Sequence, residues 1–268
     1  MLETSRVVLL AGFALLSAWP GRSSEVWAFR FNSDSLKPSM SWHDDLIFHN
    51  PTAQDATVRL LGLSNGGIRP GDRVEVAVPA GRTVSLKDLP GTWETPDAPL
   101  IWVVHVEVPD GLLAVSRGGA DVECPSPCGS PPNPFPNLGA FSMPVFRSLT
   151  PAGQEQIHMG ADLGTLGSRF NTGIYNAGHV SANATVAVYQ ACDDTLLETG
   201  SVSITADTAV QFGGLGSVPT HCPAETPLNT WLRYARVTVD QPSLSYIVNI
   251  ADPFPAGFQI PLVVPIGP

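Results

Sequence analysis

Charged residues are scarce in this sequence of 268 residues, and the charge that is present is mostly negative. They make up 14% of the chain, compared with about 25% in a typical soluble protein. Lysine occurs only at Lys37 and Lys87, and the formal net charge is −10. Nucleic acids and anionic membranes attract basic surfaces, which replace the counterions of the phosphates. The composition therefore excludes a nucleic-acid partner and makes an anionic membrane a poor one.

Long apolar runs are also missing beyond the N-terminus, so we expect no transmembrane segment. The run at 7–19 (VVLLAGFALLSAW) follows Arg6 and has thirteen residues, whereas a spanning helix needs about 20. This length and the basic residue before it are typical of a secretory signal peptide. We predict a signal peptide over 1–24, with cleavage after Ala18 or Ala28 as the limits, and a secreted, periplasmic or cell-surface protein. A buried core helix is the alternative, which the polar residues after the run disfavour.

Cysteine occurs only four times, at Cys124, Cys128, Cys192 and Cys222. In a secreted chain an even number of cysteines predicts disulfides, and four of them allow three pairings. We expect the local pairing, Cys124–Cys128 and Cys192–Cys222, because it keeps each bridge within one half of the chain. A zinc site made of these cysteines is the alternative, although it would need ligands from both halves.

Motifs for catalysis or cofactor binding are absent from the sequence. The glycine-rich stretches at 62–67 and 213–216 lack the strand and helix that flank a phosphate-binding loop. No G-x-S-x-G element marks a serine nucleophile. We therefore expect no catalytic residue, no cofactor and no metal.

Proline and glycine, by contrast, are abundant, with 26 and 25 residues. Proline at roughly twice its usual share favours many turns and disfavours long helices. Between the turns, valine alternates with polar residues, as in RVEVAVP (73–79) and RVTVD (236–240). Alternation with a period of two residues indicates strands with one buried face. These patterns predict an all-β protein of antiparallel sheets.

Three blocks of sequence occur twice in the same order, which indicates two tandem modules. We place these modules at 25–147 and 148–268, with about seven strands each, arranged as two sheets around one core. The last pair of blocks is related by a constant offset, since 237 − 106 = 131. The paired blocks are 46–60 with 172–188, 73–86 with 200–212, and 105–121 with 236–252.

The stretches HNPTAQDATVRL (49–60), VAVPAGRTVSL (76–86) and YIVNIADPFPAGFQIP (246–261) carry a pattern of turns and strands. It resembles the Ig-like repeat modules of uncharacterised secreted bacterial proteins, over about 40–147 and 165–266. The resemblance implies two tandem immunoglobulin-like antiparallel β-sandwiches and carries no assigned chemistry. The second copy departs from the pattern, because Asn176–Ala177 replaces Asn-Pro.

The densest polar cluster is His43-Asp44-Asp45, beside Trp42. A metal or acid–base site needs such groups to converge, but consecutive strand residues point to opposite faces. We interpret the cluster as solvated charge, and an enzyme with an unfamiliar site there is the alternative.

His105 and Glu107 lie two residues apart, so we expect both on an exposed sheet face in cross-strand polar pairs. His158, His179 and His221 lie in loop-like segments, and we predict that they are surface residues.

Tryptophans provide the remaining candidates for binding. Trp102 and Trp231 occupy similar places in the two halves, which favours a role in packing. Trp93 lies in a long loop without a counterpart, where an aromatic ring can stack on a sugar or anchor a partner protein. The sequence favours a non-catalytic structural or interaction protein of the cell envelope or exterior, with a carbohydrate-binding accessory protein as the alternative.

Overall fold

The computed structural model describes residues 23–31, 40–64, 74–86, 101–122, 137–143, 145–161, 169–215, 232–250 and 258–259. All named elements in these ranges are strands, β1 to β17, and they form four antiparallel sheets. The predicted all-β class is therefore confirmed. Nearly all of the predicted signal peptide lies outside the described residues, as do Trp93, Cys124, Cys128 and Cys222.

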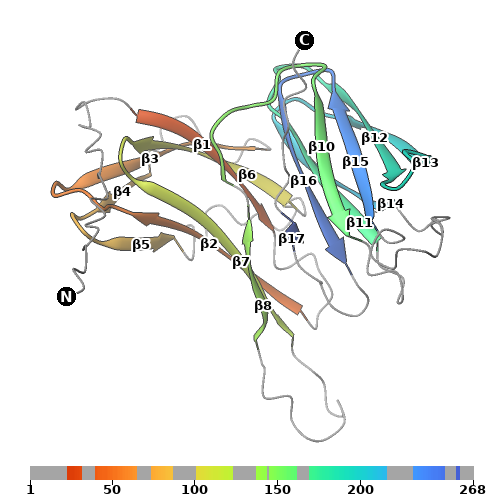
Figure 1. The fold of residues 1–268 in the computed structure, drawn as a ribbon. Coiled ribbons are helices and arrows are strands. Elements are labelled where there is room, and N and C mark those ends of the chain that lie inside the picture. Colours follow the sequence, from red (N-terminus) through yellow and green to blue (C-terminus); the bar gives the residue numbers. More distant parts are fainter. Residues whose placement is uncertain are drawn as a thin grey trace, which may run out of the picture.

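Two sheets are built from the first half of the chain, on the left in Figure 1. One sheet has the order β4 (Glu75–Val78), β3 (Ala56–Leu63), β6 (Ile101–Pro109), β1 (Ser23–Phe31) and β9 (Val145–Phe146). The other has the order β5 (Thr83–Leu86), β2 (Met40–His49), β7 (Leu113–Val122) and β8 (Asn137–Met143). Their facing sides share one apolar cluster, to which the first sheet contributes Val58 and Val106 and the second Leu46 and Phe48.

The second half forms two more sheets, on the right in Figure 1. One has the order β13 (Leu196–Ile204), β12 (Ala182–Gln190), β15 (Leu232–Val239) and β10 (Glu155–Ala161). The other has the order β14 (Thr208–Leu215), β11 (Arg169–Asn176), β16 (Ser243–Ile250) and β17 (Phe258–Gln259). Each strand β1 to β8 thus has a counterpart nine strands later, in the same position of a sheet.

The alternating sequence explains why these segments are strands. Along β12, Ala182, Ala184, Val186 and Val188 are buried, and the residues between them are exposed or half-buried. Every second side chain of a strand points to the same face, so this pattern places the apolar residues in the second-half core.

A buried asparagine ends β2 and fixes the turn that follows. Asn50 donates hydrogen bonds from Nδ2 to the carbonyl oxygens of Gln54 (2.8 Å) and Val78 (2.9 Å). Its Oδ1 accepts the backbone N–H of Thr52 at 3.0 Å. The side chain therefore replaces the main-chain partners that this turn lacks.

The side chain of Asn176 makes the equivalent hydrogen bonds at the end of β11. Its Nδ2 donates to the carbonyl oxygens of Val180 (2.8 Å) and Ile204 (3.1 Å), and its Oδ1 accepts the N–H of Gly178 at 2.9 Å. The partners lie 4 and 28 residues after the asparagine, as they do around Asn50. The two halves thus use one hydrogen-bonding arrangement at equivalent places.

A third apolar cluster joins the two halves. Its first-half members come from β1 and β6, and its second-half members come from β11, β14 and β16. The rings of Phe29 and Tyr246 meet edge to face at 4.7 Å. Gly173 is required beneath this contact, because a Cβ there would overlap the ring of Tyr246.

The connection between the halves is held at both ends. Phe146 in β9 pairs with Trp27 in β1, at the edge of a first-half sheet. Four residues later, Thr150 and Ser243 exchange two backbone hydrogen bonds of 2.9 and 3.0 Å, in the second half. The halves are therefore tied by the chain as well as by the apolar cluster.

Within the described residues each half contributes eight strands, with β9 in addition, compared with the expectation of about seven. The first-half strand that was not predicted from the sequence is β1. It overlaps the region between Ala18 and Ala28 in which we placed the cleavage site. Val26, Trp27 and Ala28 are buried in the sheet. Cleavage after Ala28 would remove these residues, and the position of the cleavage site stays a prediction.

Candidate functional site

Within the described ranges, no group of three or more metal-binding side chains comes together. The same part of the chain holds no helix with the length and apolar character needed to cross a membrane.

His43, Asp44 and Asp45 lie on β2, opposite Gly119, Gly118 and Arg117 of β7. The expected strand is thus present, and consecutive residues on it alternate between the two faces of the sheet. The side chains of the three residues lie outside the described part of the structure. Trp93 also lies outside the described residues, so both candidate sites stay predictions.

Cys192 lies in the turn after β12 and is disulfide-bonded. Gln190 Nε2 donates a hydrogen bond of 3.0 Å to its Sγ. Because Cys124, Cys128 and Cys222 are outside the described residues, the predicted pairing stays a prediction.

His105 takes part in a cross-strand pair on the outer face of its sheet, as its position predicted. Its Nε2 lies 3.1 Å from Oε2 of Glu25 on the neighbouring β1. Its ring stacks on Trp27, with the centroids 4.6 Å apart and the planes 10° from parallel. Trp27 is itself part of the cluster that joins the halves, so His105 borders that interface.

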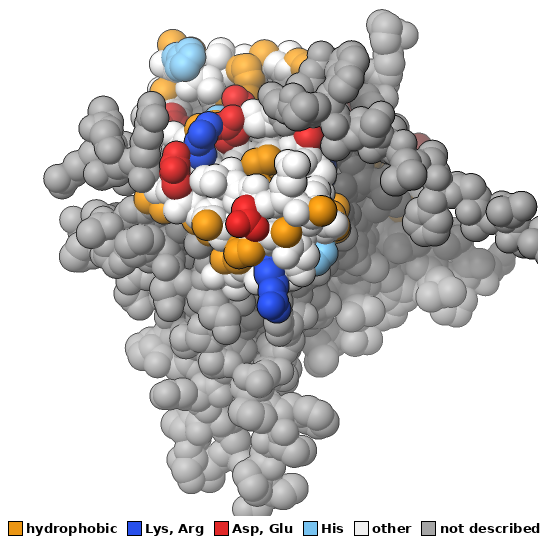
Figure 2. Space-filling view, turned by 90° about the vertical axis from the view of Figure 1, so that its left-hand side faces the viewer, with side chains coloured by type: hydrophobic (Ala, Val, Ile, Leu, Met, Phe, Trp, Pro, Cys, Tyr) orange, Lys and Arg blue, Asp and Glu red, His pale blue; other side chains and the backbone are white. Residues whose placement is uncertain are grey.

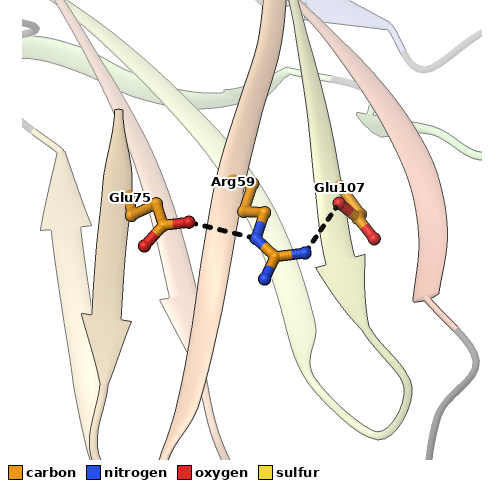
Figure 3. Close-up of polar contacts among 3 residues, drawn as sticks. All are labelled: Arg59, Glu75 and Glu107. Atoms are coloured by element: carbon orange, nitrogen blue, oxygen red, sulfur yellow. Dashed lines mark hydrogen bonds and ion pairs between the residues drawn. The ribbon is translucent and has the colours of Figure 1, made fainter. Parts of the chain in front are cut away.

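Glu107 forms the second predicted pair, with Arg59 of β3. Figure 3 shows Arg59 between two carboxylates, with Nε 3.2 Å from Glu75 and Nη1 3.6 Å from Glu107. A hydrogen bond from Ser23 and the guanidinium of Arg59 lower the pKa of Glu107. More than half of the Arg59 side chain is exposed, so water screens these pairs and they stabilise the sheet only weakly.

The face in Figure 2 shows the same mixture of charges. Basic side chains lie beside acidic ones, and apolar side chains are scattered among them. On the described part of this face, no sign of charge forms a continuous patch.

A buried polar network occupies the interior of the second half. Ser245 Oγ lies 2.7 Å from Nε2 of His158 and donates a hydrogen bond of 2.7 Å to Oε1 of Gln156. Gln156 Nε2 in turn donates to Oγ of Ser243 at 3.1 Å. All four residues are at most 1% exposed. The network links β10 in one sheet with β16 in the other.

The prediction that His158 is a surface residue is therefore wrong. On β10 the polar residues Gln156 and His158 point inward, and Glu155 and Ile157 are half-buried. A polar inward face inverts the usual pattern of strands, so the sequence of this segment looks like a loop.

Burial lowers the pKa of His158 to about 3, so its imidazole is neutral. A neutral imidazole has one N–H donor and one acceptor nitrogen. The single hydroxyl proton of Ser245 goes to Gln156, so His158 Nε2 must carry the ring proton and donate. No described residue provides Nδ1 with a hydrogen-bond partner.

The direction of these hydrogen bonds decides whether His158 and Ser245 can act as a catalytic pair. A catalytic histidine accepts the proton of its serine, whereas His158 donates to Ser245. Both side chains are also sealed from solvent. The contact therefore belongs to the interior packing of the second half.

An aromatic and cationic cluster covers the outer face of β12 and β15. The rings of Tyr189 and Tyr234 stack at 5.1 Å, and the guanidinium of Arg236 lies 4.9 and 5.5 Å from their centroids. Tyr234 Oη donates to Asp194 at 2.9 Å, and Arg236 also pairs with Glu155 at 3.7 Å. This cluster was not predicted from the sequence, although Tyr234 and Arg236 stand two residues apart on one strand face.

Comparisons with known proteins add little. No protein-family model matches the chain, and no curated protein matches it. Among solved structures, a calcium-binding mutant of Bacteroides uniformis beta-glucuronidase 2 matches 86% of this chain at 10% identity, with a TM-score of 0.26. A structure of Bacteroides uniformis beta-glucuronidase matches 84% of this chain at 11% identity, with a TM-score of 0.26. The chain spans 33% and 31% of their lengths, and likeness at this TM-score carries no functional argument.

Proposed function

We propose that this chain is a secreted or cell-envelope, non-catalytic structural or interaction protein made of two duplicated immunoglobulin-like modules, 25–147 and 148–268. The observation that carries the proposal is the matching order of the eight strands that are described in each half. The equivalent hydrogen bonds of Asn50 and Asn176 support it independently.

The immunoglobulin-like description rests on the central strand pairs. In an immunoglobulin sandwich the second and fifth strands pair in one sheet, and the third and sixth pair in the other. Here β2 pairs with β5, and β3 pairs with β6. The outer strands differ, since β1 lies beside β6 and β7 beside β2. The fourth strand differs as well, because β4 lies beside β3 here and beside the fifth strand there, so the immunoglobulin-like proposal is supported by the two central pairs alone.

A structural or binding role also suits the use of the polar residues. His105 and Glu107 make cross-strand pairs, and His158 crosslinks the two sheets of the second half. The third apolar cluster holds the halves against each other. A fixed arrangement of two modules can present surfaces at a defined spacing, which is what an interaction protein requires.

The test is to express the full chain in a bacterium and to analyse the exported product. We expect N-terminal sequencing to show cleavage between Ala18 and Ala28, the range predicted from the sequence. The purified product is then screened on a glycan array and with a panel of hydrolase substrates.

We expect neither glycan retention nor hydrolysis. Glycan binding that Trp93→Ala abolishes would replace the proposal by carbohydrate binding. Hydrolysis that His43→Ala abolishes would replace it by an enzyme with its site near His43–Asp45.

A further inference from the structure

One sheet edge of the second half is long and lacks the features that protect most edges. β13 is the last strand of its sheet and has nine residues, on the side that points away from the first half (Figure 1). Its counterpart β4 has four residues, carries Glu75 and is followed by Pro79. Natural proteins keep edge strands short or charged, or interrupt them with proline, because an open edge pairs with other strands. From Thr199 to Ile204, β13 has neither a charge nor a proline.

The two edges differ at one equivalent position. The buried asparagines that end β2 and β11 are 126 residues apart (176 − 50 = 126), and the same offset relates Ser201 to Glu75 (201 − 75 = 126). The strand registers agree, because Arg59 lies opposite Glu75 on β4. Thr185, which has the same offset from Arg59, lies opposite Ser201 on β13. The first-half edge thus carries a charge that pairs with Arg59 (Figure 3), and the second-half edge carries a neutral hydroxyl in its place.

Every second residue of β13 directs its backbone groups away from β12. The N–H of Gln190 donates to the carbonyl oxygen of Thr195 at 2.9 Å, so the backbone of Gln190 points to the β13 side. Backbone direction alternates along a strand, so Val186 points to the same side and bonds to Gly200, which lies opposite it. Within the described ranges, no backbone hydrogen bond outside the strand pairs reaches the residues of β13 that point the other way. These residues, whose side chains are exposed, are Thr199, Ser201 and Ser203.

We infer that β13 of one copy of this chain pairs antiparallel with β13 of a second copy, about a two-fold axis at Ser201. The inference rests on the proposed function as an interaction protein and names the partner. The strand is complementary to itself in this register, because Thr199 lies opposite Ser203 and Ser201 lies opposite the same residue of the second copy. The outward backbone groups of one copy then meet those of the other. The side chains that face each other are hydroxyl pairs, which stabilise neighbouring strands.

The same register keeps like charges apart and closes the assembly. Glu198, the only charged residue of β13, lies opposite Ile204. The sheets of the two copies continue into one sheet, and each copy uses its single β13. A two-fold contact of this kind is closed, so the product is a dimer and does not grow further. Pairing along one strand is a small contact, and small interfaces are transient. We therefore expect association that depends on protein concentration.

The test is sedimentation velocity on the oxidised full chain over a range of concentrations. The average mass of the natural sequence should rise with concentration toward that of a dimer and no further. Ser201→Glu gives this edge the residue of the first-half edge and places two carboxylates opposite each other at the axis. It should raise the dissociation constant several-fold, because like charges directly opposite destabilise paired strands. Ala77→Glu, at an exposed position of β4, is the matched control and should leave the association unchanged.

Mixing two variants tests the position of the axis. Ser201→Lys should weaken association as Ser201→Glu does. An equal mixture of the two should associate more strongly than either variant alone, because opposite charges then meet across the axis. A mixture that stays as weak as the single variants would overturn the pairing about Ser201.

Hydrogen exchange of the natural chain gives a readout that does not depend on the folding of any variant. The amides of Thr199, Ser201 and Ser203 should exchange more slowly at high protein concentration than at low concentration, because pairing gives them acceptors. A natural chain that stays monomeric, or one that associates without slowing these amides, would overturn the inference. Either result leaves the proposed function standing, which the glycan and hydrolase screens test.

Discussion

Acid should destabilise the second half through His158 before it protonates most carboxylates. The imidazole is 1% exposed, and burial lowers its pKa from 6.5 to about 3. Between these two pH values the unfolded chain binds a proton that the folded chain does not bind. Stability therefore rises with pH in this window, is fully present above pH 6.5, and is lost as pH falls toward 3.

The size of the effect follows from the separation of the two pKa values. Each unit of pH within the window costs about 1.4 kcal/mol. From pH 8 to pH 5 the loss is about 2 kcal/mol, and by pH 4 it reaches about 3 kcal/mol. The range above pH 5 is the informative one, because most aspartates and glutamates are still charged there.

Urea unfolding followed by circular dichroism at a series of pH values measures this loss. His158→Gln removes the titrating ring and keeps a polar side chain. We expect the variant to be less stable at pH 8 and to lose about 2 kcal/mol less than the natural chain on going to pH 5. His49→Gln, on the surface of the first half, is the matched control and should follow the natural chain. Parallel pH curves for the natural chain and His158→Gln would refute the reasoning.

Three other perturbations test the fold. Asn50→Ala and Asn176→Ala should each cost about 2–4 kcal/mol in urea unfolding, because buried carbonyl groups lose the amide donor of the asparagine. Asn183→Ala, at an exposed site, should cost less than about 1 kcal/mol. Equal losses at the three sites would contradict the role of the buried asparagines. Gly173→Ala should destabilise the protein by about 1–3 kcal/mol, because the added Cβ overlaps the ring of Tyr246. Gly62→Ala is the control, because its added Cβ meets open space. A Gly173→Ala variant as stable as the natural chain would argue against the packing between the halves. Peptide mapping should find Cys192 joined to Cys222, a bridge that stabilises by roughly 3–4 kcal/mol on loop-closure entropy; Cys192 joined to Cys124 or Cys128 would overturn the local pairing.

The sequence predicts those strands whose apolar residues alternate. In β12 and β6, valine and alanine occupy every second position over most of the strand, and this period is incompatible with a helix. Trp102 is also partly buried against the first-half core, in agreement with the packing role expected from its position. These features depend on local sequence alone.

The polar interior of the second half could not be predicted in this way. Gln156 and His158 find their partners on a strand that begins more than 80 residues later. Only the folded arrangement of β10 and β16 shows that these side chains are satisfied inside. The sequence of β10 therefore lacks the signal that identifies the other strands.

The sequence also could not show that equivalent residues of the two halves lie in different environments. Leu113 and Leu244 occupy the same place in the repeat, yet the first is exposed and the second is buried. The difference arises from the neighbouring half, which covers only one of the two faces. Periodicity reports which face of a strand is apolar, but it does not report what lies against that face.

The most direct test of two duplicated modules is the unfolding of residues 148–268 on their own, expressed in an oxidising compartment. The fragment contains β10 to β17 and its own core. Separation exposes Leu244 and Tyr246, so a Tyr246→Ser version of the fragment keeps the result free of aggregation. The account predicts one cooperative unfolding transition by calorimetry, at a lower temperature than in the full chain. A fragment that shows no cooperative transition in either version would contradict the account.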